Sequence, residues 1–278
     1  MSRLLALATA SAILLATAGA APAARPDRFD EAAAWAFVRR QVALGPRPAG
    51  SPPSRRLAAI LRASIPRGRY QEVPGGLRNV IGIVAGRQPG RVVVVGAHYD
   101  TKDLPRFVGA NDGASGTAVV RQLARQIRPR QLRPTVVFVF FDGEEAPRGV
   151  PDSEFERYGL RGSKVAAPTL RHAEAAIILD FVGDRRLAFP RERNSDRTLW
   201  SRLRRAAGRV GHGRHFPARE RSGILDDHVP FVRAGVPAID LIDFDFACWH
   251  RPCDNLSAVS PRSLDVTGES VLELLRSF

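Results

Sequence analysis

Residues 91–100 read RVVVVGAHYD, an apolar run that stops at a histidine, a tyrosine and an aspartate. Residues 92–95 carry no polar side chain, which is typical of a strand covered on both faces. Further strand-like apolar runs occupy residues 79–84, 135–141, 175–179 and 236–242. Stretches with helical spacing alternate with most of these runs. This alternation predicts a single α/β domain in which a mixed, mostly parallel sheet is flanked by helices.

The predicted helices are marked by apolar residues that recur every three or four positions. We expect them over residues 30–44, 54–64, 115–127 and 194–210, from 160 onward, and from 260 or 263 to 275. The candidate N-caps are Ser54, Ser195 or Asp196, and Ser260 or Ser263. Residues 146–160 are polar and contain glycine and proline, so we expect a loop there that covers the site.

The N-terminus has the features of a secretory signal peptide. Arg3 precedes an apolar run over 4–18, and small residues follow at 21–23. The alternative, a membrane anchor, would need roughly 20 apolar residues. We therefore expect a signal peptide over 1–23 and a catalytic domain over 24–278. The exported protein would be secreted or associated with the cell envelope, without a membrane span after cleavage.

The formal net charge is +14, and it comes almost entirely from arginine, because Lys102 and Lys164 are the only lysines. The arginines are scattered and are not interleaved with aromatic residues, so we expect a solvated basic surface and no nucleic-acid partner. Such a surface would favour anionic envelope surfaces or acidic substrates. The oligomeric state is left open, with a monomer favoured.

The two cysteines, Cys248 and Cys253, lie on either side of Trp249 and His250. In an oxidising compartment they are expected to form a disulfide that closes this short loop. The alternative is a pair of free, buried thiols.

Five side chains of metal-ligand type lie at or after the ends of separate apolar runs: His98, Asp112, Glu145, Asp180 and His250. Binding residues collect at the ends of strands in open α/β sheets. Imidazoles and carboxylates without thiolates are typical of a hydrolytic zinc centre. Asp100 is a candidate to orient His98 through its second ring nitrogen.

Other polar residues in these motifs are assigned supporting roles. Glu144 is the candidate general acid and base, because it adjoins Glu145 and its side chain points elsewhere. Asp180 also requires a partner as a buried acid, either a second metal or a hydrogen-bond network. Asp226 is a candidate for substrate binding or proton transfer, and Trp249 for the wall of the pocket. GANDGASG at 109–116 could instead cap a helix or bind phosphate, but it lacks the phosphate-loop pattern.

Taken in order, these motifs resemble family twenty-eight of the zinc metallopeptidases, which includes aminopeptidases and glutaminyl cyclases. The resemblance runs from about residue 79 to the C-terminus and implies the zinc exopeptidase fold, of phosphorylase-hydrolase type. GANDGASG resembles the aminopeptidases. HYDTK with FVGA, FDGEEA, Asp226 in DDHVPF, and Trp249 before His250 resemble the glutaminyl-peptide cyclotransferases. The animal cyclases differ in the turn at 109–116 and have a histidine where this chain has Asp240.

The resemblance implies two alternative enzymes acting on the N-termini of peptides or proteins. In a cyclase, Asp112, Glu145 and His250 would hold one zinc ion, and Glu144, Asp180 and Asp226 would move protons. Trp249 and Lys102 would then bind the substrate, and N-terminal glutamine would become pyroglutamate with release of ammonia. In an aminopeptidase, His98 and Asp180 would complete a site for two zinc ions. A third alternative is a non-catalytic envelope-binding protein that keeps the zinc ligands.

Overall fold

The computed structural model describes residues 28–278, so the predicted signal peptide over 1–23 lies outside the described residues. The central sheet contains β1 (Arg69–Val73), β2 (Leu77–Val84), β3 (Gln88–His98), β4 (Pro134–Phe141), β5 (Ala175–Asp180) and β8 (Ala238–Ile242). The longer helices are α1 (Glu31–Val42), α2 (Pro52–Ser64), α3 (Ala114–Gln126), α5 (Arg161–Thr169), α6 (Arg197–Arg209) and α8 (Pro261–Arg276). Two short helices are α4 (Phe155–Tyr158) and α7 (His228–Arg233), and a small second sheet pairs β6 (Arg191–Glu192) with β7 (Glu220–Arg221).

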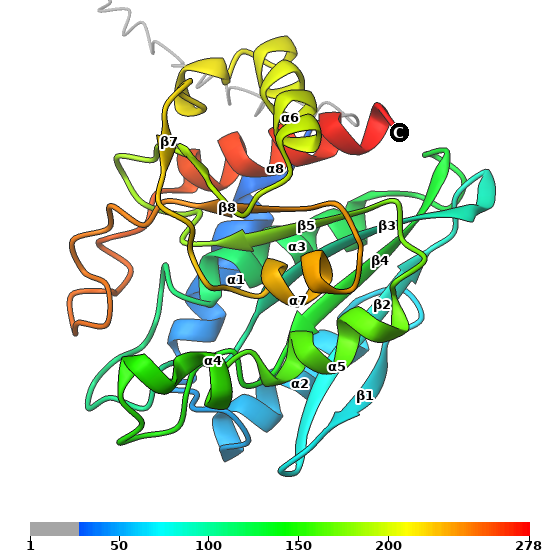
Figure 1. Ribbon diagram of the computed structural model, residues 1–278. Helices are drawn as coiled ribbons and strands as arrows, with labels where there is room; N and C mark the ends of the chain where they lie inside the picture. Colours follow the sequence, from blue (N-terminus) through cyan, green and yellow to red (C-terminus); the bar gives the residue numbers. More distant parts are fainter. Residues whose placement is uncertain (1–27) are drawn as a thin grey trace, which may run out of the picture.

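The six strands of the central sheet follow the order β1-β2-β4-β3-β5-β8 (Figure 1). β4, β3, β5 and β8 run parallel, while β2 is antiparallel to both β4 and β1. The prediction of a mixed, mostly parallel sheet flanked by helices is therefore confirmed. Because the four parallel strands end on the same side, the residues that follow them meet at one edge of the sheet.

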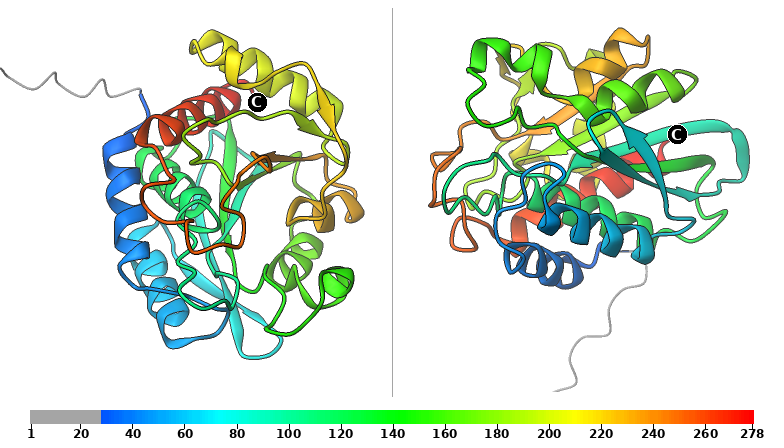
Figure 2. Two further views of the ribbon diagram at one scale, coloured as in Figure 1. Left: turned by 90° about the vertical axis from the view of Figure 1, so that its left-hand side faces the viewer. Right: turned by 90° about the horizontal axis from the view of Figure 1, so that it is seen from below.

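Helices cover both faces of the sheet, as the left view of Figure 2 shows. α1, α2, α3, α6 and α8 lie on one side, and α5 and α7 lie on the other. Along β3, Val93 and Val95 pack into the first layer, whereas Val92 and Val94 pack into the second. This two-sided burial explains why the strand shows no alternation of polar and apolar residues.

Several local expectations required correction. The cap of α2 is Ser51, whose side chain accepts a hydrogen bond from the Ser54 N–H, so the helix starts two residues before the predicted one. Asp196, one of two candidates, caps α6. Residues 146–160 include the short helix α4, and the edge strand β1 was not predicted. Among residues 28–278, no helix has both the length and the apolar character needed to cross a bilayer.

Candidate metal centre and active site

The sheet edge at the carboxyl ends of the parallel strands brings the predicted ligands together. His98 is the last residue of β3, and Asp180 is the last residue of β5. Glu145 follows β4, Asp112 lies just before α3, and His250 lies in the loop after β8. Four of them are nearly inaccessible to solvent, and His250 is partly exposed. Residues up to 152 positions apart in the sequence, from His98 to His250, therefore share one site.

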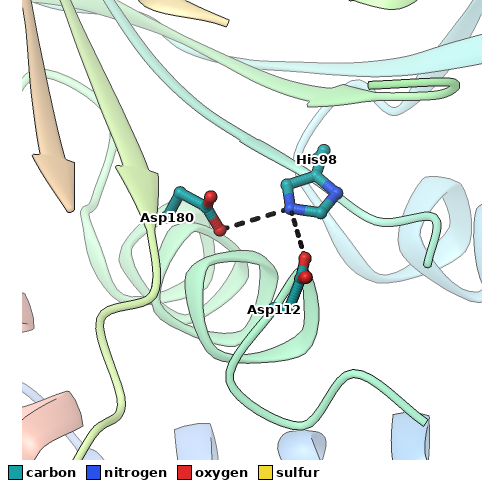
Figure 3. A group of neighbouring side chains, drawn as sticks. All are labelled: His98, Asp112 and Asp180. Atoms are coloured by element: carbon teal, nitrogen blue, oxygen red, sulfur yellow. Dashed lines mark hydrogen bonds and ion pairs between the residues drawn. The ribbon is translucent and has the colours of Figure 1, made fainter. Parts of the chain in front are cut away.

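One ligand group consists of His98, Asp112 and Asp180, and both aspartates face the same ring nitrogen of His98, as Figure 3 shows. Its Nε2 atom lies 3.3 Å from Asp112 Oδ1 and 3.2 Å from Asp180 Oδ1. Its Nδ1 atom lies 3.6 Å from Asp100 Oδ1, on the side predicted for an orienting carboxylate. Nearby acids, first Asp180, raise the pKa of His98 well above its ordinary value although burial opposes this.

A second ligand group joins the other carboxylate oxygen of Asp112 to Glu145 and His250. His250 Nε2 lies 3.0 Å from Glu145 Oε1 and 3.5 Å from Asp112 Oδ2. Asp112 thus belongs to both groups, one oxygen facing each histidine. Lys102 Nζ lies 3.2 Å from Glu145 Oε2, so the predicted substrate-binding lysine contacts a candidate ligand directly.

These donor sets fit zinc. Ligands about 2.0–2.2 Å from one ion lie roughly 3.0–3.6 Å from one another, and the distances in both groups match that spacing. Asp112 Oδ2 is buried and has no hydrogen-bond partner among residues 28–278. Burial and the charge of Glu145 raise the pKa of Asp112, so its ionised form needs a counter-charge. A cation at either group would supply that counter-charge, and one in the Glu145–His250 group would also bind the unpaired oxygen.

Two buried aspartates hold the ligand backbones in place. Asp100 accepts hydrogen bonds from the N–H groups of Glu144 and Glu145, at 3.2 Å each. Asp254 accepts from the N–H groups of Asn111, at 2.7 Å, and Asp112, at 3.0 Å. Sequence reasoning missed Asp254, because the contact joins positions 142 apart and the sequence offers no local signal for it.

Arg47, from the loop between α1 and α2, supports the same turn through its carbonyl oxygens. Its fully buried guanidinium donates hydrogen bonds to the carbonyl oxygens of Val108, at 2.9 Å, and Gly109, at 3.2 Å. Gly109 has a φ of +50° and Gly113 a φ of +82°, conformations that favour glycine. The glycine-rich stretch is therefore a turn whose positive-φ glycines and backbone hydrogen bonds set the position of Asp112.

Glu144 has the environment expected of a proton carrier. Burial and the adjacent charge of Glu145 raise the pKa of Glu144 well above its ordinary value. Asp180 is similarly affected by burial, which raises its pKa to about 7. Glu144, Asp180 and Asp226 all line one cavity, so the three predicted catalytic carboxyl groups face a common space.

That cavity has a volume of about 290 Å³ and lies over the two ligand groups. Its wall is mainly apolar and aromatic, with Phe155, Phe181, Ile224, Leu225, Ile242, Phe244 and Trp249. Trp249 is 40% exposed and lies 4.9 Å from Phe244 and 4.7 Å from His250, measured between ring centroids. Asp152 and Phe155 line the cavity too, in agreement with the expected position of the 146–160 loop.

The loop that carries Trp249 and His250 is closed by a disulfide between Cys248 and Cys253, as predicted. His250 has a φ of +51°, an uncommon conformation for a residue with a side chain. The closed loop and the edge-on contact between His250 and Phe107 therefore fix the ligand from two sides.

Comparison with known proteins identifies the family of this chain. The model of peptidase family M28 matches residues 79–275. A glutaminyl-peptide cyclotransferase of Drosophila melanogaster is 29% identical over 213 residues, which are 63% of this chain and 58% of the relative. The chain spans less than two thirds of the length of the first curated relatives that it matches.

The solved structures that resemble this chain include glutaminyl cyclases and zinc-dependent exopeptidases. A glutaminyl cyclase from an Acidobacteriales bacterium has a TM-score of 0.78 and 29% identity, with 95% of this chain and 98% of that chain covered. A Zn-dependent exopeptidase from Parabacteroides distasonis has a TM-score of 0.81 and 26% identity, with 90% and 99% covered. Because the family model covers most of the chain and includes every candidate ligand, this protein belongs to peptidase family M28.

Proposed function

We propose that this chain is a zinc-dependent glutaminyl-peptide cyclotransferase, which converts N-terminal glutamine of peptides into pyroglutamate and releases ammonia. The observation that carries the proposal is the position of Glu144. This buried carboxyl group, with its raised pKa, lines a small and mainly apolar cavity beside the Asp112–Glu145–His250 group. The similarity to named glutaminyl cyclases supports the same reaction.

The residues present can perform the required proton transfers. Zinc bound by Asp112, Glu145 and His250 would polarise the γ-carboxamide oxygen of the substrate. Glu144, in its ionised form, accepts a proton from the α-amine as the α-nitrogen attacks the carbonyl carbon (Cδ) of the γ-carboxamide. It then donates that proton to the departing nitrogen, so the carbon–nitrogen bond of the amide breaks and ammonia leaves. Asp226 lines the same cavity and is positioned to share protons with this system.

Part of the cavity wall is aromatic, which suits ring closure. Trp249, Phe181 and Phe244 would help to keep water from the reacting carbonyl, as ring closure requires. Lys102 forms an ion pair with Glu145 and also lines the cavity, where it can contact a substrate carbonyl.

Hydrolysis of N-terminal residues is the second candidate, and the His98 group favours it. His98, Asp112 and Asp180 have the spacing of a further metal site, which a di-zinc aminopeptidase would need. In that enzyme Glu144 would accept a proton from water in place of the amine.

The test is an ammonia-release assay on dipeptides that begin with glutamine or leucine, run on the protein without its first 23 residues. We expect ammonia from the glutamine substrate and no cleavage of the leucine substrate. Glu144→Gln should abolish ammonia release, whereas the exposed control Glu31→Gln should not. Cleavage of both substrates would establish the aminopeptidase, and zinc binding without either reaction would revive the non-catalytic alternative.

We also propose that the protein is exported, on the strength of residues 1–23. N-terminal sequencing of the protein recovered from an expressing bacterium is expected to start near residue 24. A first residue at position 1 in a cytoplasmic fraction would contradict export.

A further inference from the structure

We propose that Asp226, His228 and Asp240 form a separate binding site for a divalent transition-metal cation beneath the cavity floor. Asp226 lies just before α7, His228 is the first residue of α7, and Asp240 is in the middle of β8. Each offers a ligand atom, and these atoms lie within 4.8 Å of one another. Asp226 also belongs to the proposed reaction, so the test of this inference reads metal content and not activity.

The spacing in this cluster suits a bound ion better than a direct hydrogen bond. His228 Nδ1 lies 3.6 Å from Asp240 Oδ2, which is too long for a hydrogen bond. Two ligands about 2.1 Å from one ion are separated by roughly this distance. The same relation holds for the ring nitrogens and carboxylates of the two groups around Asp112.

The other ring nitrogen of His228 faces a carboxylate, the usual arrangement for a histidine that binds a metal. His228 Nε2 lies 3.3 Å from Glu192 Oε1. Glu192 Oε2 accepts hydrogen bonds from the N–H groups of Asn194, at 2.8 Å, and Ile224, at 3.1 Å. Glu192 is thus fixed in place, and it can orient His228 with Nδ1 toward the two aspartates.

The cluster needs a compensating group because it is buried. Asp226 is 3% exposed, and His228 and Asp240 are fully buried. Both side-chain oxygens of each aspartate have no donor among the described residues, and the Nδ1 atom of His228, which faces them, has no hydrogen-bond partner there either. Unpaired buried polar atoms are rare and costly. A cation would bind one atom of each residue and neutralise the adjacent carboxylates.

One imidazole and two carboxylates suit a divalent cation such as Zn²⁺, which takes imidazole ligands, or Mn²⁺, which prefers carboxylates. Asp226 also lines the cavity together with Glu144. A cation bound to Asp226, His228 and Asp240 would therefore fix the Asp226 carboxylate at the floor of the active site. The ion would reach its site from the cavity past Asp226.

Metal counting tests the site apart from catalysis. The starting variant carries Asp112→Asn and Glu145→Gln, which disrupts both groups around Asp112. After incubation with Zn²⁺ or Mn²⁺ and removal of unbound metal, its metal content is measured by mass spectrometry. We expect Asp240→Asn in this background to remove one ion per chain, and His172→Gln, an exposed control, to remove none. Equal metal content with and without Asp240→Asn would overturn the proposal and indicate that the aspartates share a proton instead.

A second measurement does not depend on how the variants fold. Crystals of the unaltered protein grown with Mn²⁺ are examined by anomalous scattering. A peak between His228 and Asp240 is expected, and its absence while Mn²⁺ occupies the groups around Asp112 would overturn the site.

Discussion

Removing the disulfide should weaken metal binding at His250 while leaving the sheet intact. The double substitution Cys248→Ser and Cys253→Ser opens the loop that contains His250 and Trp249. Residues 251–253 are exposed, so opening the loop uncovers little of the core. His250, in contrast, adopts a positive φ and reaches Glu145 over 3.0 Å from inside this loop. We therefore expect the conformational entropy of the open loop to lower the affinity of His250 for the metal.

The size of the effect follows from the length of the loop. The disulfide joins residues separated by 5 positions. For so short a loop, the chain-entropy relation gives about 2 kcal/mol at room temperature. Because about 1.4 kcal/mol is a factor of ten in affinity, the expected loss of zinc affinity is roughly 30-fold.

The assay is a competition titration between the protein and a chromophoric zinc chelator. It compares the unaltered protein, the double variant and the unaltered protein after reduction of the disulfide. Both open forms should lose affinity to the same extent, with unchanged far-ultraviolet circular dichroism and activity that returns at high zinc. Unchanged affinity in the open forms would refute the reasoning, and so would collapse of the fold in both.

Three further predictions follow from the surroundings of the ligands. Glu144→Gln should lower kcat by a factor on the order of 10²–10⁴ with unchanged zinc content, and an unchanged rate would remove Glu144 from the mechanism. Because burial and Glu145 raise the pKa of Glu144, which must be ionised to accept a proton, kcat/KM should rise with pH through a midpoint above the ordinary value of about 4.3. A midpoint at or below that value would contradict the assignment. Asp254→Asn leaves one backbone N–H of the Asp112 turn facing an amide donor in place of a carboxylate oxygen. The free energy of unfolding, measured in urea, should therefore fall by about 1–3 kcal/mol. The exposed control Asp245→Asn should show little change, and equal losses in the two variants would argue against the Asp254 contact.

The positions of the central strands could be predicted from the sequence because burial on both faces leaves long apolar runs. β3 and β4 are examples, and the polar residues that follow them had to meet at one edge of the sheet. The five candidate ligands could be selected for the same reason. Their convergence in the structure agrees with the selection, while their individual roles stay predictions.

Features held by contacts between distant residues were not predictable. β1 reads RYQEV and is largely accessible, so its pairing with β2 leaves no apolar pattern. Asp254 and Arg47 look like ordinary surface residues in the sequence, yet both are fully buried and hold the Asp112 turn. The cap of α2 was misplaced because Ser51 precedes two prolines, which suit the first turn of a helix as well as a loop.

The central claim, that the α-amine rather than water attacks the substrate, is tested most directly by running the reaction in water enriched in heavy oxygen. A peptide with N-terminal glutamine is incubated with the zinc-loaded protein, and the products are weighed by mass spectrometry. The account predicts a pyroglutamyl peptide that has lost ammonia and carries no heavy oxygen. Free glutamine with heavy oxygen in its new carboxylate would contradict it and would show that the site is an aminopeptidase.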